Sequence, residues 1–197
     1  MSNLVVVIKS DNDRNSCINL VLESLMIQTY RPNKVIFWNY PPENYSVFNI
    51  LCNMYNIDND EIIIDKLNIL DKSIKDFDII IGISSRDILN INFLKYHKDI
   101  LEKNNCITSS ITSEFIDHGL CHFYPNLNRI EDITWNREEP FIYTYDSVSL
   151  DNFGITRNLL KDVNYIDSKF FLTCKKNLIP CLTHKHLHKI MIPKNIS

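Results

Sequence analysis

The sequence predicts an α/β fold, with one mainly parallel central sheet and helices packed on its faces. Short apolar runs alternate along the chain with segments in which apolar residues recur at helical spacing. Two of these runs, Leu4–Ile8 and Asp78–Ile83, are rich in β-branched residues and end in polar residues before a helix. Strands that alternate with helices are joined by right-handed crossovers, which makes most of the sheet parallel.

The first half of the chain supplies four expected strands and two expected helices. The strands are Leu4–Ile8, Val35–Trp38, Glu61–Ile64 and Asp78–Ile83. Asn15 or Ser16 can cap the first helix, which ends before Pro32. The second helix follows the break at Pro41-Pro42. The apolar faces are Cys17, Leu20, Val21, Ser24 and Leu25 in the first helix and Val47, Ile50, Leu51 and Met54 in the second.

The second half is less regular. A helix is expected from Asn92, a strand at Ile107–Thr112, and mostly loop from Asp117 to Glu139. Strand character returns at Phe141–Tyr145, and a short helix is expected over Asp167–Lys176. The inward residues of the two helices are Phe93, Leu94, His97, Ile100 and Leu101 in the first and Phe170, Phe171 and Cys174 in the second.

Composition narrows the class of protein. A chain of 197 residues with 45% apolar and 23% charged residues is most simply one globular domain. A net charge of -3 gives no reason to expect a nucleic acid or an anionic membrane as partner. No apolar run is long enough to span a membrane, and no secretory signal is recognisable, so we expect a cytoplasmic protein. The six cysteines are scattered, which argues against a zinc site and for buried free thiols.

One sequence motif, at the end of the first expected helix, resembles a motif of a known protein family. Ser24-Leu-Met-Ile-Gln-Thr-Tyr-Arg-Pro32 reproduces the pattern Ser-Leu-x-x-Gln-Thr-Tyr-x-Pro that closes the first helix in family-two nucleotide-sugar glycosyltransferases. The chain resembles this family well over its first half and loosely beyond. The resemblance implies a single GT-A-like (Rossmann-like) domain over residues 1–197, with a nucleotide-binding half (1–90) and an acceptor-binding half (91–197).

The resemblance implies donor-binding residues at the strand ends. The family's Pro-Thr-Tyr-Asn after the first strand corresponds to Lys9-Ser-Asp-Asn12, so Ser10 and Asn12 match best. The family's Asp-Asp-Gly-Ser after the second strand corresponds to Asn39-Tyr-Pro-Pro. The amide of Asn39 both donates and accepts hydrogen bonds, so the nucleotide base is left open.

The acidic triplet that holds a divalent cation in the family is missing. Ser84, Ser85 and Arg86 stand there, and only Asp87 is acidic. One carboxylate is a poor cage for Mg²⁺ or Mn²⁺, so we expect no metal dependence or a weak one. Arg86 can bind phosphate bidentately in place of the metal. Alternatively, the site has decayed and Arg86 pairs with Asp87 or a helix end.

Two further groups of basic residues, a pair of lysines and a cluster of three histidines, each have two possible interpretations. Lys72 and Lys75 can reach phosphates or lie solvated on a surface helix. His184, His186 and His188 alternate, so they share one face of a strand, and His186 with Asp87 is the pair we would expect around a metal. Three surface histidines without an acidic partner are the alternative.

Asp167 matches the family's catalytic base. It precedes a helix in the segment Val163–Pro180, where Phe170-Phe171 and Lys175-Lys176 agree with the family pattern. A carboxylate at a helix start is also an ordinary N-cap. Asp151 and Asn152 lie where the family shapes its acceptor pocket, although they can equally form a turn.

The resemblance implies a glycosyltransferase that moves a sugar from a nucleotide diphosphate donor to a hydroxyl of a glycan or protein, with inversion if Asp167 is the base. The alternative is a catalytically inactive, glycosyltransferase-like binding protein. A different Rossmann-like nucleotide binder is disfavoured, because no glycine-rich phosphate loop follows the first strand.

Overall fold

The computed structural model describes residues 2–10, 18–39, 42–54, 56–62, 67–68, 73–117, 141–142, 148–150, 152–160, 163–177 and 179–192. The predicted caps Asn15 and Ser16, the segment 118–140 and most of Phe141–Tyr145 lie outside these residues. Within the part of the chain that is described, no helix combines the length and the apolarity needed to cross a bilayer.

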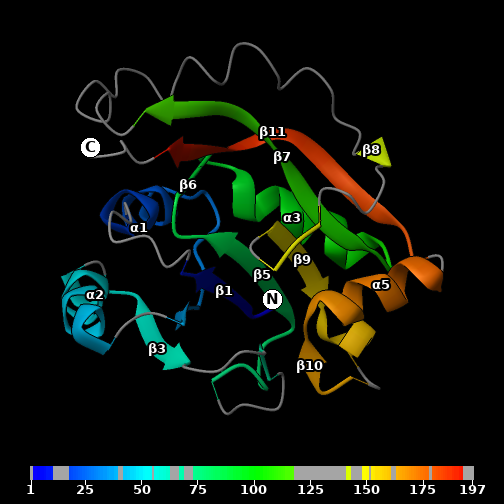
Figure 1. Ribbon diagram of the computed structural model, residues 1–197, viewed down its shortest axis with the longest axis horizontal. Helices are drawn as coiled ribbons and strands as arrows, with labels where there is room; N and C mark the ends of the chain where they lie inside the picture. The colour runs from blue at the N-terminus through cyan, green and yellow to red at the C-terminus, as the bar shows by residue number, and fades with distance from the viewer. Residues whose placement is uncertain are drawn as a thin grey trace.

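The described residues form a nine-stranded mixed sheet in the order β3-β2-β1-β5-β9-β7-β11-β6, with β8 paired to β11 (Figure 1). Its first four strands are parallel: β3 (Asp58–Ile62), β2 (Lys34–Trp38), β1 (Leu4–Lys9) and β5 (Ile79–Ser84). Three of them match strands predicted in the first half, whereas β3 begins three residues before the predicted Glu61–Ile64, whose last two residues lie outside the described residues. The mainly parallel α/β class is therefore confirmed.

The second half of the sheet is mixed. β9 (Asn152–Thr156) lies antiparallel between β5 and β7 (Ile107–Asp117). The two longest strands, β7 and β11 (Cys181–Ile192), run parallel and lie side by side (Figure 1). β6 (Asp87–Leu89) and β8 (Phe141–Ile142) pair antiparallel with β11, and β10 (Tyr165–Ile166) pairs with β4 (Leu67–Asn68) in a separate small sheet.

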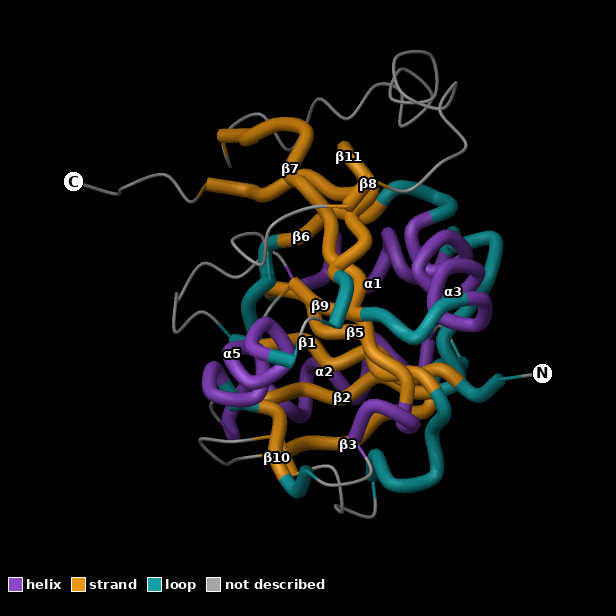
Figure 2. The backbone as a smooth tube through the Cα atoms, turned by 90° about the vertical axis from the view of Figure 1, so that its right-hand side faces the viewer, coloured by secondary structure: helices purple, strands orange, loops and turns teal. Residues whose placement is uncertain are grey.

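Helices cover both faces of the sheet. The helices are α1 (Ile18–Met26), α2 (Pro42–Met54), α3 (Phe93–Lys103) and α5 (Ser168–Lys176), with a short 3₁₀ helix, η3 (Arg157–Leu160). Figure 2 shows α3 and α5 on opposite sides of the sheet. One apolar core lies beneath α1, α2 and α3, and a second lies beneath α5.

Strand β1 separates the two cores. Leu4–Ile8 are all fully buried, as a continuous apolar run predicts. Val6 and Ile8 belong to the core beneath α1–α3, whereas Val5 and Val7 belong to the core beneath α5. The side chains of β1 thus alternate between the two faces of the sheet.

The structure confirms the predicted buried faces of α3 and α5 and corrects that of α2. The five residues predicted inward on α3 and the three on α5 are all buried. On α2, however, Ile50 is 60% and Met54 70% exposed, while Phe48 and Cys52 are buried. Phe48 stacks on Phe37 of β2, with ring centroids 4.8 Å apart. The face of α2 that carries Phe48 therefore packs against the sheet in place of the predicted face.

Candidate active site

The ends of three parallel strands meet at one edge of the sheet. Lys9, the last residue of β1, lies opposite both Trp38 of β2 and Ser84 of β5. The Ser10 amide donates to the Trp38 carbonyl at 2.9 Å, and the Ser85 amide donates to the Lys9 carbonyl at 3.0 Å. Ser10, Asn39 and Ser84 therefore share the edge at which open α/β sheets bind their ligands. Asn12 lies outside the described residues.

Asn39 is placed by its backbone. It directly follows β2 and has φ of 59°, in the left-handed region that asparagine tolerates better than most residues. This backbone conformation gives an asparagine a structural reason to stand at position 39, in addition to any contact with a ligand.

The turn between β5 and β6 is closed by a carboxylate. The Ser84 amide donates to Oδ2 of Asp87 at 2.8 Å, and the Arg86 amide donates to the Ser84 hydroxyl at 3.2 Å. Ser84, Ser85 and Asp87 are buried, and Arg86 is half-buried at the tip of the turn. Asp87 thus holds the backbone of the turn together.

The residues at this turn do not fit a divalent cation. Mg²⁺ and Mn²⁺ need several oxygen ligands, but the triplet position offers two hydroxyls and a guanidinium, and one oxygen of the single carboxylate nearby, Oδ2 of Asp87, accepts from the Ser84 amide. Among the described residues, no three His, Cys, Asp or Glu side chains come together in a group that could hold a metal.

The histidine cluster lies on a strand, as its alternation predicts. His184, His186 and His188 fall within β11, but their side chains are outside what the structure describes. The register places His188 opposite Leu89 and Ile190 opposite Asp87, with irregular pairing between Lys185 and His188. His188 is therefore the histidine whose backbone lies across from β6, whereas the predicted pairing of His186 with Asp87 around a metal depends on a side chain that the structure does not describe.

Asp167 caps helix α5. Its Oδ1 accepts a hydrogen bond of 2.9 Å from the Phe170 amide, and its backbone is extended, as is usual at an N-cap. The neighbouring Phe170 and Phe171 are buried and hold the first turn of the helix against the core beneath α5. The capping role is thus present in the structure.

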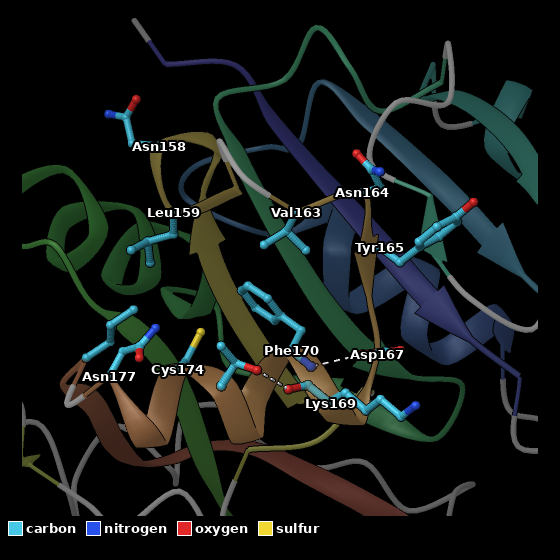
Figure 3. Close-up of a pocket in the computed structure, with 12 residues that line it drawn as sticks. Asn158, Leu159, Val163, Asn164, Tyr165, Asp167, Lys169, Phe170, Cys174 and Asn177 are labelled. Carbon is cyan, nitrogen blue, oxygen red and sulfur yellow. Dashed lines mark hydrogen bonds between the residues drawn. The ribbon is translucent and has the colours of Figure 1, made fainter.

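The direction of α5 tells where this cap lies. After α5, the carbonyl of Pro180 accepts from the amide of Ile107, where β7 starts, and β7 runs in the same direction as β5. Asp167 and Asn177 lie at opposite ends of the helix (Figure 3). Because the C-terminal end of α5 lies where the parallel strands start, Asp167 is on the side where they end.

A cavity of about 700 Å³ lies beside Asp167, between α5, η3 and the segment 163–167 (Figure 3). Its apolar lining comes from Leu159, Val163, Phe170, Cys174 and Ile179. Its polar lining comes from Asn158, Asn164, Tyr165, Asp167, Lys169, Thr173 and Asn177. Amide, hydroxyl and aromatic groups of this kind can hold a polar ligand such as a sugar.

Asn152 lies in a strand rather than in a turn. It pairs with Ile83 in β9, close to the edge that carries Ser84. Its amide is engaged with Ser110: Oδ1 accepts from the Ser110 amide at 3.0 Å, and Nδ2 donates to the Ser110 carbonyl at 2.7 Å. These bonds link β9 to β7. Asp151 lies outside the described residues.

Lys75, the described lysine before β5, lies away from this edge. Lys75 is exposed in a turn that precedes the first residue of β5, and Lys72 is outside the described residues. Arg157 fixes this turn by donating to the carbonyls of Phe77 at 2.9 Å and Ile74 at 2.6 Å. Lys75 is therefore at the edge where the strands start, where it supports the interpretation as a solvated surface lysine.

Lys9 is the residue at this edge that sequence analysis missed. It occupies a position that the family resemblance matches to a proline, so the comparison of motifs gives it no role. The signal was nevertheless present, because a lysine directly ends a fully buried apolar strand.

Several solved structures have a fold similar to that of this chain. The structure of S. aureus TarS 1-349 in complex with UDP-GlcNAc matches with a TM-score of 0.62 at 13% identity, covering 99% of this chain and 59% of that one. The complex of the same protein with UDP matches with a TM-score of 0.60 at 12% identity over 96% of this chain and 60% of that one. The mannosyltransferase PcManGT from Pyrobaculum calidifontis, in complex with GDP-Man and Mn²⁺, matches with a TM-score of 0.58 at 10% identity over 100% and 57%.

The chain spans about three fifths of the length of these proteins. No protein-family model matches the sequence, and no curated protein matches it. The likeness to the solved structures establishes the fold class: a Rossmann-like α/β domain of the GT-A type, with a mainly parallel mixed sheet flanked by helices.

Proposed function

We propose that this chain is a glycosyltransferase that binds a nucleotide diphosphate sugar where β1, β2 and β5 end. The observation that carries the proposal is the shared register of Lys9, Trp38 and Ser84, which gathers polar residues at the ligand-binding edge of a GT-A-type fold. The structures of TarS and PcManGT that share this fold contain UDP-GlcNAc and GDP-Man, respectively.

The proposed reaction transfers the sugar with inversion, in one displacement. The hydroxyl oxygen of a glycan or protein acceptor forms a bond to the anomeric carbon. The bond from this carbon to the diphosphate oxygen breaks, and its electron pair leaves with the nucleoside diphosphate. Asp167 takes the acceptor proton as general base. Its position on the side where the parallel strands end supports this role.

The two halves of the chain divide the task. Ser10, Asn12, Asn39, Ser84, Arg86 and Asp87 are proposed donor-binding residues, and all lie within residues 1–90. The cavity beside Asp167 is formed by residues 158–179, and we assign the acceptor to this half, 91–197. We also propose that Asp151 and Asn152 border the acceptor site. Asn152 acts indirectly there, because its side-chain amide positions the backbone of Ser110.

A second function is favoured by one observation. Asp87, the carboxylate closest to the missing acidic triplet, is bonded to the Ser84 amide. An acidic residue used in this way supports a protein that binds a sugar nucleotide, or a partner, without turnover. Asp167 would then serve only as the cap of α5.

A panel of nucleoside diphosphates and nucleotide sugars distinguishes these functions. Thermal unfolding with each compound, with and without Mn²⁺, reports binding as a rise in Tm. The compounds that bind are then incubated with glycan acceptors, and nucleoside diphosphate release is followed by chromatography. Transfer or donor hydrolysis supports the enzyme, whereas binding without release supports the inactive form. No rise in Tm with any compound contradicts the enzyme and the sugar-nucleotide-binding form, and leaves a protein that binds a partner.

A further inference from the structure

We propose that Lys9 supplies the positive charge that faces the diphosphate of the donor, in the place that a divalent cation fills when an acidic triplet is present. The inference rests on the proposed function and deepens it, because it assigns a binding residue and a metal-independent mode of phosphate recognition.

The pleat of the sheet places Lys9 on the same face as Asp167. In β1, Val5 and Val7 point into the core beneath α5, and Lys9 continues this series. In β5, Ile80 belongs to the same core, so Ser84, four residues later, is on this face as well. Lys9 and Ser84 are opposite each other in the parallel register. Neighbouring strands lie about 4.8 Å apart, so the two side chains start as immediate neighbours.

The ammonium group of Lys9 is not used by the fold. Lys9 is half-buried, and its side chain makes no hydrogen bond or ion pair with any residue that the structure describes. Lys34 at the other end of the neighbouring strand differs in this respect, because its ammonium lies 3.7 Å from Asp58 and 3.5 Å from Asp60. A lysine ammonium at the end of a buried strand, with no carboxylate partner among the described residues, is available to an anionic ligand, and the donor diphosphate is such an anion.

The turn next to Lys9 carries a second positive charge, the guanidinium of Arg86. Arg86 is half-buried two residues after Ser84, and its amide is fixed to the Ser84 hydroxyl at 3.2 Å. Asp87, the carboxylate in the same turn, is bonded to the Ser84 amide. Lysine offers a compact point charge and arginine a planar fork, so together they can bind the two phosphates of a diphosphate without a metal.

The test measures the affinities of UDP, GDP, ADP and CDP in EDTA by isothermal titration, and those of the matching nucleosides by ligand-observed NMR. We expect the wild-type protein to bind at least one diphosphate. Lys9→Met should weaken that binding at least about tenfold while the affinity for the nucleoside stays the same, because only the phosphates lose a partner. Lys9→Arg should restore most of the affinity.

Lys95→Met is the matched control, since Lys95 is an exposed lysine on α3, on the other side of the sheet. It should leave both affinities unchanged. A Lys9→Met protein with wild-type diphosphate affinity overturns the role of Lys9 and leaves the proposed function intact. Equal losses for nucleoside and diphosphate also overturn it, because Lys9 would then act on the shape of the site.

Two further outcomes are decisive. A wild-type protein that binds none of the diphosphates contradicts the proposed function and this inference together. If Lys9→Met does not fold, Lys9→Gln replaces it under the same criteria: diphosphate affinity must fall while nucleoside affinity stays the same. Unchanged diphosphate affinity in Lys9→Gln overturns the proposal.

Discussion

Asp167 is the observed N-cap of α5 and the proposed general base, and only the second role needs an ionisable carboxylate. As a cap, it only has to accept the Phe170 amide at 2.9 Å, which an asparagine oxygen does as well. As a general base, it has to accept a proton, which an amide cannot do at neutral pH. The substitution by asparagine therefore separates the tasks.

We expect Asp167→Asn to keep the stability of the protein while its turnover falls by roughly 10²–10⁴-fold. Asp167→Ala should lose turnover as well and cost about 1 kcal/mol of unfolding free energy, because the cap is removed. Denaturant unfolding and nucleoside diphosphate release measure the two effects. Unchanged turnover in Asp167→Asn would leave Asp167 with the capping role alone.

The buried cysteines give a pH-dependent stability. The four described cysteines Cys52, Cys106, Cys174 and Cys181 are buried thiols that form no disulfide, which confirms the sequence prediction for these residues. Burial raises the pKa of the Cys52 thiol from 9.0 to about 12. Between these values the unfolded chain loses the thiol proton and the folded chain keeps it, so stability is present below pH 9.0 and falls as the pH rises.

For a single thiol this loss is about 1 kcal/mol at about pH 10. We expect Cys52→Ala to remove this part of the alkaline loss, although the substitution lowers stability at neutral pH by leaving a small cavity. Urea unfolding of both proteins at about pH 7 and about pH 10 gives the comparison. Identical alkaline losses in the two proteins would show that Cys52 ionises equally in the folded and unfolded chains.

At the level of secondary-structure elements, the structure explains the Ser24–Pro32 motif at the end of α1. Gln28 is buried, and its Nε2 donates to the carbonyls of Ser24 at 2.9 Å and Asn90 at 2.7 Å. Its Oε1 accepts from the amide of Leu94 at 3.0 Å, in the first turn of α3. The hydroxyl of Ser24 accepts from the Leu89 amide at 3.2 Å. The phrase thus ties the end of α1 to β6 and to the start of α3.

Replacing Gln28 by leucine should lower the unfolding free energy by roughly 2–4 kcal/mol, since a side chain of similar size leaves buried backbone groups unpaired. Asn92, the N-cap of α3, makes no side-chain capping bond, so α3 depends on Gln28 for the Leu94 amide. Chemical denaturation measures the loss. Met54→Ala, at an exposed position on α2, is the control and should stay within about 0.5 kcal/mol of wild type. A similarly small change in Gln28→Leu would contradict the role of this bond network.

The sequence predicts elements well where the information is local. The helical spacing of α3 identified all five of its buried residues, and the apolar run of β1 identified a strand buried on both faces. On α2, two faces have similar spacing, and only the contact of Phe48 with Phe37 decides between them. Local patterns also could not place β9 between β5 and β7, because this pairing joins segments distant in the chain.

The candidate site was predictable to the same extent. The strand ends identified Ser10, Asn39 and Ser84 because parallel strands bring their ends to one edge. The engagement of Asn152 with Ser110 and of Asp87 with the Ser84 amide depends on side-chain geometry, which a motif does not contain. The motif comparison gave Lys9 no role, because it selects residues that match the family pattern and Lys9 stands where the family has a proline.

For the whole molecule, the main functional expectation concerns metal dependence. With hydroxyls and a guanidinium at the triplet position, we expect EDTA to change donor affinity and turnover by no more than about twofold, since no strong oxygen cage is lost. Activity measured in EDTA, and then with added Mn²⁺ or Mg²⁺, checks this. Activity that EDTA abolishes and Mn²⁺ restores would contradict the expectation and would direct attention to Asp87 and the histidines of β11.

The pairing of β6 has a consequence for how the protein forms during synthesis. β6 follows β5 after a two-residue turn, yet its partner is β11, with Asp87 opposite Ile190, roughly a hundred residues later. While the nascent chain leaves the ribosome, β1, β2 and β5 can assemble early, but the strand that leaves the Ser84–Asp87 turn has to wait for β11. The edge proposed to bind the donor is therefore completed last, and a ribosome-bound chain that ends before β11 should carry most of the parallel sheet without a finished donor site.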